Sequence, residues 1–398
     1  MRGQQGDDDV GGRGNTVGGL RQAARAHAFV PMSLNLLFTG DLVLDEPRPE
    51  YWLEGIAPAL LGADVVIGHL EVPHTTRHSE LRSDVPAPGA DPAHIAALAK
   101  AGFHAVSLAG NHMADCGAVG IDDTLAALDS AGIIHNGAGR DLQAASAPGL
   151  FSRNGRRLVL LSYNCVGPEE SWASDTRAGT AYVRIETADG SRIAPAAPLE
   201  RPDRESLSSL SRDITRQRGD GAIVIVALHK GIVHTPARLA PYEREVAHAA
   251  IDAGADIVIG HHAHIVRGIE FHRGKPIFHG LGNGCVVTRA LSPEGDDPAR
   301  AAWALRRQQL FGFTPDPAYY LAPFHPQAVN AMLGRVRVDD DGALRTGFVP
   351  VHVDAPGRPR IASATEAPDI VRYIERITTE AGLPPITARL DGTTAWIQ

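Results

Sequence analysis

Two histidines spaced two residues apart are the first candidates for chemistry in this sequence. His262 and His264 close the stretch Gly254-Ala-Asp-Ile-Val-Ile-Gly-His-His-Ala-His264, directly after a run of apolar residues. Imidazole is a common ligand of transition metals, and two such rings beyond the end of a strand can point at one centre. The pattern alone is equally compatible with a surface turn, so it needs support from elsewhere in the chain.

Other apolar runs also end in polar residues of matching chemistry, namely Asp41, Glu71, Asn111, His112 and His229. Carboxylate and amide oxygens mixed with imidazole nitrogens suit Mn, Fe, Zn or Ni better than calcium. Each residue has a simpler explanation when taken alone, such as a turn residue, a loop cap or one half of an ion pair. Together with the two histidines above, they predict a metal site.

Short apolar strands that alternate with helices must position these residues. Apolar runs predict strands over residues 34–39, 64–71, 104–108, 158–162, 222–228, 256–259 and 276–278. Helical spacing predicts helices near residues 51–61, 92–101, 120–131, 206–217 and 242–253. Gly102 and Gly132 are expected to end two of these helices. A final antiparallel pair is expected at residues 334–338 and 347–351, and a C-terminal helix at residues 368–381.

Strands that are apolar throughout are buried on both faces, which is typical of a layered α/β fold. Ligands in such folds gather at the carboxyl ends of the strands. The candidate residues all lie at such ends, and this coincidence is the strongest argument in the sequence for a functional site.

The chain divides into three expected parts. Residues 1–31 are rich in Gly, Arg, Gln and Asp and have no apolar segment, so we expect a disordered extension, with Met32 as an alternative translation start. Residues 32–355 are expected to form the α/β domain, with residues 288–330 inserted as a lid or side loop. Residues 356–398 are expected to be a C-terminal helix and tail.

The composition is that of an ordinary soluble protein and argues against some classes of function. The 398 residues are 43% hydrophobic and 21% charged, as in a typical globular protein. A net charge of −8 argues against a nucleic-acid partner, which usually requires a basic face. No apolar run approaches the roughly 18 residues of a membrane helix, so no membrane partner is expected. Cys116, Cys165 and Cys285 follow no disulfide or metal spacing, which favours a reducing, cytoplasmic location.

Six motifs follow one another along the chain: Gly40-Asp41, His69-Leu-Glu71, Ala109-Gly-Asn-His-Met-Ala-Asp-Cys-Gly117, Leu228-His-Lys-Gly231, Gly254–His264 and Gly280-Leu-Gly-Asn283. In order and spacing they resemble the bacterial CapA/PgsA family, named for poly-γ-glutamate capsule synthesis, within the calcineurin-like metallophosphoesterase superfamily. The resemblance implies a four-layer α/β/β/α sandwich. It also implies a centre of two divalent transition-metal ions, such as Mn, Zn or Fe.

The resemblance implies a role for each motif residue. The metal ligands would be Asp41 and His264 at the first ion, Glu71 between the two ions, and Asn111, His229 and His262 at the second ion. His112 would be the general acid or transition-state donor, and Asp115 would orient it. His69 and His261 are expected to be neighbours of the site and not ligands.

The sequence departs from the family pattern in three places. The superfamily motif Asp-x-His has no histidine here, because Leu42 and Val43 follow Asp41, and this leaves the first metal with fewer ligands. Glu71 stands where the superfamily usually has aspartate. Many capsule-type members read His-Trp-Gly-x-Glu, whereas this chain reads His229-Lys-Gly-Ile-Val233, which implies a different substrate pocket.

The preferred hypothesis is a soluble metal-dependent hydrolase, in which metal-activated water attacks a phosphoester or a γ-glutamyl-type amide. Its substrate would be a small molecule or an anionic γ-glutamyl or phosphorylated compound. Lys230, His234 and Arg82 either contact this substrate or are solvated surface residues. One alternative is a non-catalytic protein that binds or assembles an anionic polymer. Another is a tailoring enzyme that makes or cleaves an amide in a biosynthetic pathway. The oligomeric state stays open.

Overall fold

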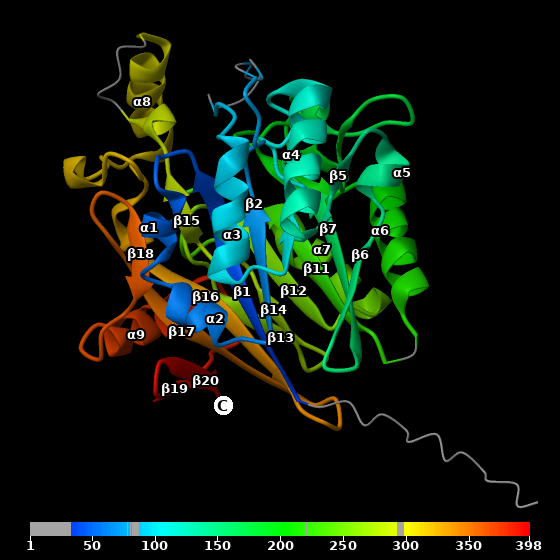
Figure 1. Ribbon diagram of the computed structural model, residues 1–398, viewed down its shortest axis with the longest axis vertical. Coiled ribbons are helices and arrows are strands. Elements are labelled where there is room, and N and C mark those ends of the chain that lie inside the picture. The colour runs from blue at the N-terminus through cyan, green and yellow to red at the C-terminus, as the bar shows by residue number, and fades with distance from the viewer. Residues whose placement is uncertain (1–32, 78, 80, 82–86, 220, 293–297) are drawn as a thin grey trace, which may run out of the picture. The chain divides into compact units, whose positions relative to one another are not determined.

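The computed structural model describes residues 33–77, 79, 81, 87–219, 221–292 and 298–398, and these residues form a mixed α/β fold (Figure 1). The expected α/β class is therefore confirmed. The extension expected over residues 1–31, the alternative start Met32 and the side chain of Arg82 lie outside the described residues. Most strands of the described chain belong to two large sheets.

The larger sheet has ten strands among the described residues, in the order β19-β20-β17-β16-β1-β2-β3-β4, with β15 beside β1 and β18 beside β17. The strands are β1 (Leu34–Leu44), β2 (Val65–Leu70), β3 (Ala105–Ser107), β4 (Ile134–Asn136), β15 (Asn283–Val287), β16 (Asn330–Val338), β17 (Leu344–Asp354), β18 (Arg358–Ile361), β19 (Ala388–Asp391) and β20 (Thr394–Ile397). β1 to β4 pair in parallel, whereas β16 and β17 are antiparallel. The expected final antiparallel pair is thus confirmed as part of β16 and β17.

The smaller sheet has six strands among the described residues, in the order β13-β14-β12-β11-β7-β6. They are β6 (Gly149–Arg153), β7 (Arg156–Asn164), β11 (Ile223–Lys230), β12 (Ile257–His262), β13 (Ile269–His272) and β14 (Lys275–Phe278). Two short pairs complete the strands: β5 (Ala138–Gly139) with β8 (Gly179–Thr180), and β9 (Ile185–Thr187) with β10 (Leu199–Pro202).

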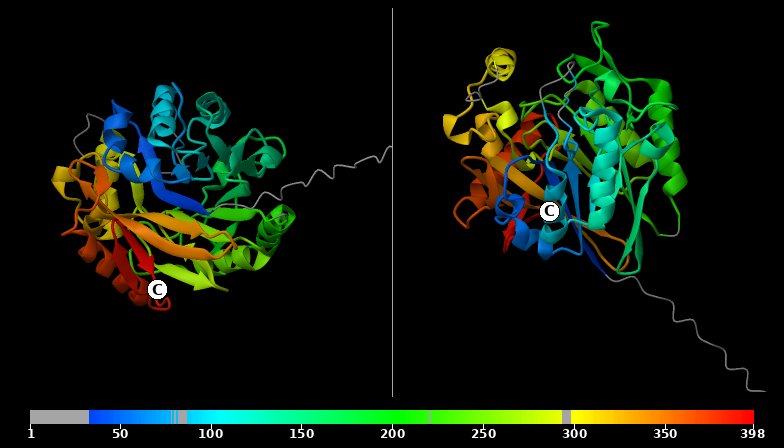
Figure 2. Two further views of the ribbon diagram at one scale, coloured as in Figure 1. Left: turned by 60° about the horizontal axis from the view of Figure 1, so that its bottom comes forward. Right: turned by 45° about the horizontal axis from the view of Figure 1, so that its top comes forward.

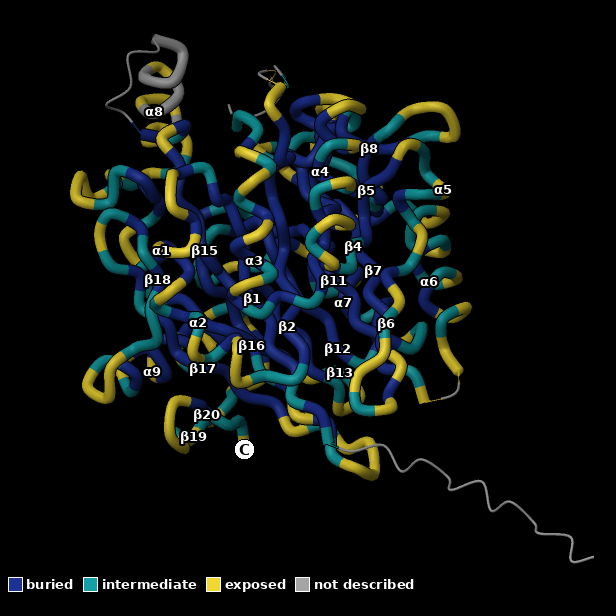
Figure 3. The backbone as a smooth tube through the Cα atoms, in the orientation of Figure 1, coloured by how far each residue is buried: buried dark blue, intermediate teal, exposed yellow. Residues whose placement is uncertain are grey.

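Alternate residues of the central strands face different cores, because successive side chains of a strand point to opposite faces of its sheet. In β1, Leu36 and Phe38 belong to a core shared with β11 and β12, whereas Leu37 belongs to a core on the other face. In β11, Ile225 faces the shared core and Val226 faces a third core. Figure 3 shows these central strands as buried. Each fully buried side chain of this size contributes roughly 1.5–3 kcal/mol, so the shared core holds the two sheets together.

Helices pack against the outer faces of the two sheets and complete the apolar cores there. α1 to α4 contribute to the core on the outer face of the larger sheet, α6 and α7 to that on the smaller sheet, and α9 to the shared core (Figure 2). The helices are α1 (Pro49–Leu53), α2 (Ala57–Leu61), α3 (Ile95–Ala101), α4 (Gly117–Ala131), α5 (Leu142–Ala145), α6 (Arg204–Gln217), α7 (Pro241–Ala253), α8 (Pro298–Phe311) and α9 (Ala367–Glu380). Short 3-10 turns are η1 (Pro92–His94), η2 (Glu169–Ser171), η3 (Arg289–Leu291), η4 (Pro317–Tyr319) and η5 (Pro326–Val329). Across the described ranges, no helix is both long enough and apolar enough to span a membrane.

The first strand is longer than expected. β1 does not stop at Gly40 but continues to Leu44, and its pairing register shifts on both sides of Asp41. A Cβ atom at Gly40 would lie 1.9 Å from the carbonyl oxygen of Gly282, so the close approach of these two segments requires glycine. Asp41 therefore lies inside a bent strand and not after its end.

Three further segments differ from expectation. The helix expected near residues 51–61 is two helices, α1 and α2, because the chain turns at Gly55, where a Cβ would lie 2.4 Å from the carbonyl oxygen of Pro359. The segment 288–330, expected to be irregular, contains α8, whose Ala, Leu, Arg and Gln residues are strong helix formers. The residues after α9, expected as a tail, form β19 and β20, and β20 pairs with β17.

Candidate metal centre

The carboxyl ends of strands from both large sheets meet at one place, and the predicted metal ligands come together there. From the larger sheet, Asp41 lies in β1, Glu71 directly follows β2 and Asn111 lies in the loop after β3. From the smaller sheet, the residues are His229 in β11, His262 at the end of β12 and His264 just beyond it. Five of these six residues are buried, and the side chain of His264 is 13% exposed.

The first group of ligand atoms belongs to Asp41, Glu71 and His264, and these atoms lie within 4.8 Å of one another. Nε2 of His264 lies 3.2 Å from Oε1 of Glu71, and Nδ1 of His264 lies 3.5 Å from Oδ2 of Asp41. Nδ1 is also 2.9 Å from Oδ1 of Asn283, at the start of β15. A hydrogen bond donated by Nδ1–H to Asn283 fixes the ring so that Nε2 faces Glu71, as a metal-binding histidine requires.

The three side chains of this group shift one another's pKa values away from the ordinary ones. Burial alone would lower the pKa of His264, but Glu71 and Asp41 raise it to about 9. Burial alone would raise the pKa of Glu71, but His264 lowers it to about 2. Burial and the charge of Glu71 hold the pKa of Asp41 well above its usual value. The imidazolium thus offsets one carboxylate while burial opposes ionisation of the second, whereas a divalent cation would favour the ionised form of both.

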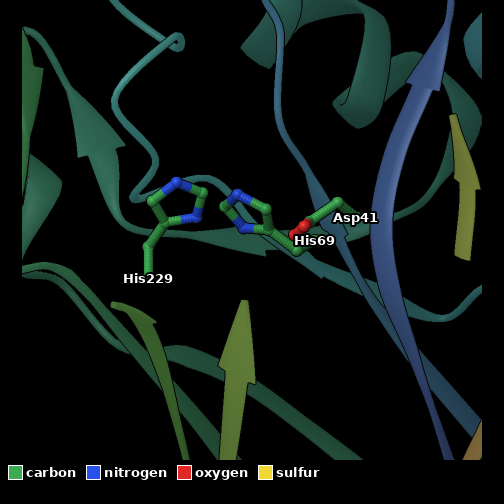
Figure 4. A group of neighbouring side chains, drawn as sticks. All are labelled: Asp41, His69 and His229. Atoms are coloured by element: carbon green, nitrogen blue, oxygen red, sulfur yellow. The ribbon is translucent and has the colours of Figure 1, made fainter. Parts of the chain in front are cut away.

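The second group consists of Asp41, His69 and His229, whose ligand atoms also lie within 4.8 Å of one another. In Figure 4 the ring of His69 stands between the carboxylate of Asp41 and the ring of His229. The centres of the two imidazole rings are 4.6 Å apart. The pairing of β1 with β2 places Asp41 opposite His69, which explains why these two side chains meet.

His69 is a candidate ligand that the sequence interpretation assigned to the surroundings of the site. Its Nδ1 lies 2.8 Å from Oγ of Ser107, while its buried Nε2 has no hydrogen-bond partner among the described residues. Burial and the neighbouring His261 keep the pKa of His69 well below its usual value, so the ring is neutral and Nε2 can bind a metal. A signal was present in the sequence, because His69 and Glu71 are two residues apart and share one side of the chain.

His229 joins the remaining predicted ligands to this group. Its Nε2 lies 2.7 Å from Oδ1 of Asn111 and 3.1 Å from Nδ1 of His262. Burial lowers the pKa of His262 to about 3 and holds that of His229 well below its usual value, so both rings are neutral. Nε2 of a neutral ring carries at most one proton, which cannot serve both neighbours fully. Three electron-rich atoms gathered in this way fit a metal ion.

Asp41 is the residue that the two groups have in common. The bridging role that the resemblance implies for Glu71 stays a prediction, and Asp41 is a further carboxylate placed close to the ligand atoms of both groups. The backbone N–H of His262 lies 3.2 Å from Oδ2 of Asp41, which orients this carboxylate. Oε2 of Glu71 is buried without a hydrogen-bond partner among the described residues, which also fits a ligand for a cation.

His112 and Asp115 form the pair that the sequence predicts. Nδ1 of His112 lies 2.9 Å from Oδ2 of Asp115, and both residues are buried. A carboxylate that accepts from Nδ1–H fixes the tautomer of the ring and stabilises its protonated form. This pair therefore has the geometry of an oriented acid–base histidine.

The backbone is strained at three histidines around the end of β12. His262 has a φ angle of 88° and His264 one of 52°, and nearby His234 has one of 56°. Residues other than glycine seldom adopt positive φ values, and each such residue costs on the order of 1–3 kcal/mol. Strain of this kind concentrates at functional sites, where the surrounding structure maintains it.

A cavity of about 390 Å³ opens at the metal-ligand side chains. Its lining includes Glu71, His112, His262 and His264. Residues from the segment 288–330 form part of its wall, including residues at the end of α8. This segment therefore contributes to the cavity. The sequence alone did not decide between a lid and a side loop for it.

Two of the three side chains expected near the substrate can be located. His234 lines the cavity. Lys230 does not, because it is fully buried and its Nζ lies 3.0 Å from Oε2 of Glu243 and 3.1 Å from Nδ1 of His279. Neither role expected for Lys230, as a substrate contact or as a solvated surface residue, applies. Cys116, beside the site, is a buried thiol whose pKa is raised by burial.

Comparison with known proteins identifies relatives of this chain. A probable polyglutamine synthesis accessory protein of Mycobacterium tuberculosis is 36% identical over 196 residues, which are 48% of this chain and 47% of the relative. The capsule biosynthesis protein CapA of Bacillus anthracis is 27% identical over 262 residues, 63% of this chain and 59% of the relative. The PGA biosynthesis protein CapA of Bacillus subtilis is 25% identical over 275 residues, 67% of this chain and 66% of the relative.

The chain spans about half the length of the first of these relatives and up to 66% of the others. The sequence pattern of one family, described as bacterial capsule synthesis protein PGA_cap, matches residues 35–286. This range contains both groups of ligand atoms and the His112–Asp115 pair. Because the match covers more than half of the chain, the protein belongs to the bacterial capsule synthesis PGA_cap family.

Proposed function

We propose that this protein is a metal-dependent hydrolase that uses water to cleave a phosphoester or an amide bond. The observation that carries the proposal is the presence of two groups of buried carboxylate and imidazole ligand atoms that share Asp41. A mixed oxygen and nitrogen set suits divalent Mn, Zn or Fe. When bound, two such ions would supply Lewis-acid activation of water and of the substrate oxygen.

Different residues of this chain would hold the ions and orient their ligands. Those that would hold the ions are Asp41, Glu71, His69, Asn111, His229, His262 and His264. Asn283 would keep the ring of His264 in the orientation for binding. Phosphoester and amide hydrolysis both remain candidates, because the same centre can polarise a phosphoryl or a carbonyl oxygen.

His112 would transfer the proton that the leaving group requires. Asp115 accepts from Nδ1 of His112, so Nε2 is the ring nitrogen that would exchange a proton with the substrate. His112 lines the cavity, where a leaving group would lie. A positioned acid of this kind typically accelerates a reaction by about 10²–10⁴-fold.

We also propose that the fold is the four-layer α/β/β/α sandwich of the metallophosphoesterases. Three apolar cores support this arrangement, one shared by the two large sheets and one between each sheet and its helices. Such a sandwich would bring the carboxyl ends of strands from two sheets to one site, as metal binding by both requires.

A second candidate function is non-catalytic binding or assembly of an anionic polymer. It is favoured by the names of the relatives, one of which is called an accessory protein of polyglutamine synthesis. The buried ligand atoms that have no hydrogen-bond partner among the described residues favour the hydrolase, because a surface for binding a polymer has no need of them.

Metal analysis combined with a substrate screen tests the proposal. Protein purified without chelator is analysed by plasma mass spectrometry, beside His262→Ala, His264→Ala and the surface control His135→Ala. We expect two ions per chain in the wild type and the control, and fewer in the other two variants. Turnover is then measured on p-nitrophenyl phosphate esters and on γ-glutamyl anilides. Protein that stays metal-free after reconstitution with Mn, Zn or Fe would exclude the hydrolase and favour the binding protein.

A further inference from the structure

The cavity beside the candidate metal centre is largely apolar outside the metal ligands. Its walls include Val43, Val72, Val233, Val286, Phe311 and Phe324. A volume of about 390 Å³ is within the range of small-molecule sites, which are mostly apolar with a few polar groups that fix orientation. The metal ligands would be those polar groups here.

Away from the metal ligands, the described lining of the cavity offers little positive charge to a substrate. Arg306, on the exposed side of α8, is the one Lys or Arg among the described residues that line it. Lys230, the closest cation in sequence to the ligand His229, is fully buried and bound to Glu243. Recognition of a multiply charged anion relies on clustered Arg and Lys side chains. This cavity lacks such a cluster in the described part of the chain.

The apolar wall begins directly at the metal ligands. The ring of Phe324 stacks on that of His264, with ring centres 4.7 Å apart and an angle of 18° between the planes. His234 contacts Phe311 edge-on at 4.9 Å between ring centres and also lies near Phe324, at 5.7 Å. A substrate bond held at His264 would therefore have its neighbouring group against these aromatic rings.

We propose that the substrate carries an apolar alkyl or aryl group next to the bond that is hydrolysed, and that this cavity selects it over a charged group. The inference rests on the proposed hydrolase function and names its substrate class. Burying an apolar group removes its surface from water, whereas a carboxylate in the same place would lose its hydration with the exposed Arg306 as its one cationic partner among the described lining residues. A γ-glutamyl polymer with its free carboxylates would be a poor ligand for this part of the site.

Two phosphonates of similar shape test the proposal without requiring turnover. We would titrate manganese-loaded protein with 4-methylphenylphosphonate and with 4-carboxyphenylphosphonate, using calorimetry. The phosphonate group is the same in both compounds, so a difference in affinity is due to the methyl or carboxylate group in the cavity. We expect the methyl compound to bind at least about tenfold more tightly, in line with typical discrimination by apolar pockets. Equal binding, tighter binding of the carboxylate, or no binding of either would overturn the inference.

Two leucines of α8 provide a matched pair of variants. Leu310 lines the cavity and is 50% exposed, whereas Leu305 is 65% exposed and is not part of the lining. We expect Leu310→Asp to reduce the preference for the methyl compound several-fold and Leu305→Asp to leave it unchanged. Both side chains are at least half exposed, so both variants should fold. An unchanged preference in Leu310→Asp would contradict the assignment of this wall.

The outcome separates this inference from the proposed function. Selective binding of the methyl compound, with no hydrolysis of any ester or anilide, would support the apolar substrate site and contradict the proposed hydrolase function. Hydrolysis that favours substrates with a carboxylate beside the scissile bond would support the proposed hydrolase function and contradict the apolar substrate site.

Discussion

His264 and Glu71, which follow strands of different sheets, face each other with Nε2 of the histidine 3.2 Å from Oε1 of the glutamate. This contact joins the two sheets by a charged pair at the place where a metal ion would lie between the same two side chains. The proton on His264 and the metal therefore compete for the same carboxylates. Metal binding should displace this proton.

The first prediction concerns the pH dependence of metal affinity. The pKa of His264 is raised from 6.5 to about 9 by Glu71 and Asp41 against the effect of burial. The metal-free ring is therefore protonated at neutral pH and must lose a proton to bind a metal. Loss of this one proton should raise the affinity about tenfold per pH unit up to pH ~9, and loss of a proton from Asp41, whose pKa is also raised, would make the slope steeper. The pKa values of His69, His229 and His262 are lowered, so these rings are already neutral and add no such slope.

Competition with a fluorescent chelator between pH 6.5 and 8.5 measures this slope. The His264→Ala variant is the control, because it should bind metal weakly and with little dependence on pH. A flat profile in the wild type would show that no proton is displaced.

The second prediction is that His69 is needed for one of the two ions. His69→Asn removes Nε2 from the group formed with Asp41 and His229, while leaving the group of Asp41, Glu71 and His264 intact. We expect metal content to fall by about one ion per chain, and the increase in melting temperature on adding metal to shrink. The matched control is His135→Asn, since His135 pairs with Asp129 at the surface. Unchanged metal content in His69→Asn would show that His69 is a neighbour of the site and not a metal ligand.

The position of most site residues could be predicted because each lies at or just beyond the end of an apolar run. Such runs form buried parallel strands, whose carboxyl ends converge. This reasoning predicts that His262, His264 and Glu71 share one site, and it requires no knowledge of strand order. It also explains why β11 and β12 were recognised although both are longer than expected.

What the sequence did not reveal depends on contacts between distant segments. Asp41 is shared by both groups because β1 bends there and its register places Asp41 opposite His69. On its other side β1 pairs with β15, and Gly40 lies against Gly282, over 200 residues away in the chain. β19 and β20 were missed for a similar reason, because their place is determined by pairing with β17 and not by local pattern.

The third prediction separates proton transfer from metal binding. His112→Gln should lower turnover by about 10²–10⁴-fold with unchanged metal content, because His112 would act on the leaving group. Asp115→Asn should cause a smaller loss and shift the pH–rate profile, since the amide cannot stabilise the protonated ring. Steady-state rates from pH 5 to 9, with metal content measured in parallel, check both. The control is Asp123→Asn on α4, where Asp123 bonds to Thr75. Loss of metal in His112→Gln would make this residue a ligand.

The fourth prediction concerns the buried ion cluster next to the metal centre. Glu243 accepts from Lys230 at 3.0 Å and from Arg267 at 3.1 Å, and all three side chains are fully buried. Glu243→Gln would leave two buried cations without their carboxylate. Breaking a buried ion pair in this way costs about 3–5 kcal/mol of unfolding free energy. Urea unfolding at pH 7 measures the loss, with the exposed Glu245→Gln on the same helix as the control.

The effect of Glu243→Gln should depend on pH in one direction. Burial alone would raise the pKa of Glu243, but Arg267 and Lys230 lower it from 4.5 to about 2. Since the pKa in the folded protein is below the ordinary value, the stabilisation is fully present above pH 4.5 and is lost as the pH falls toward 2. The difference in stability between wild type and variant should therefore narrow in acid. A variant within about 1 kcal/mol of the wild type at pH 7 would show that Lys230 and Arg267 do not depend on this carboxylate.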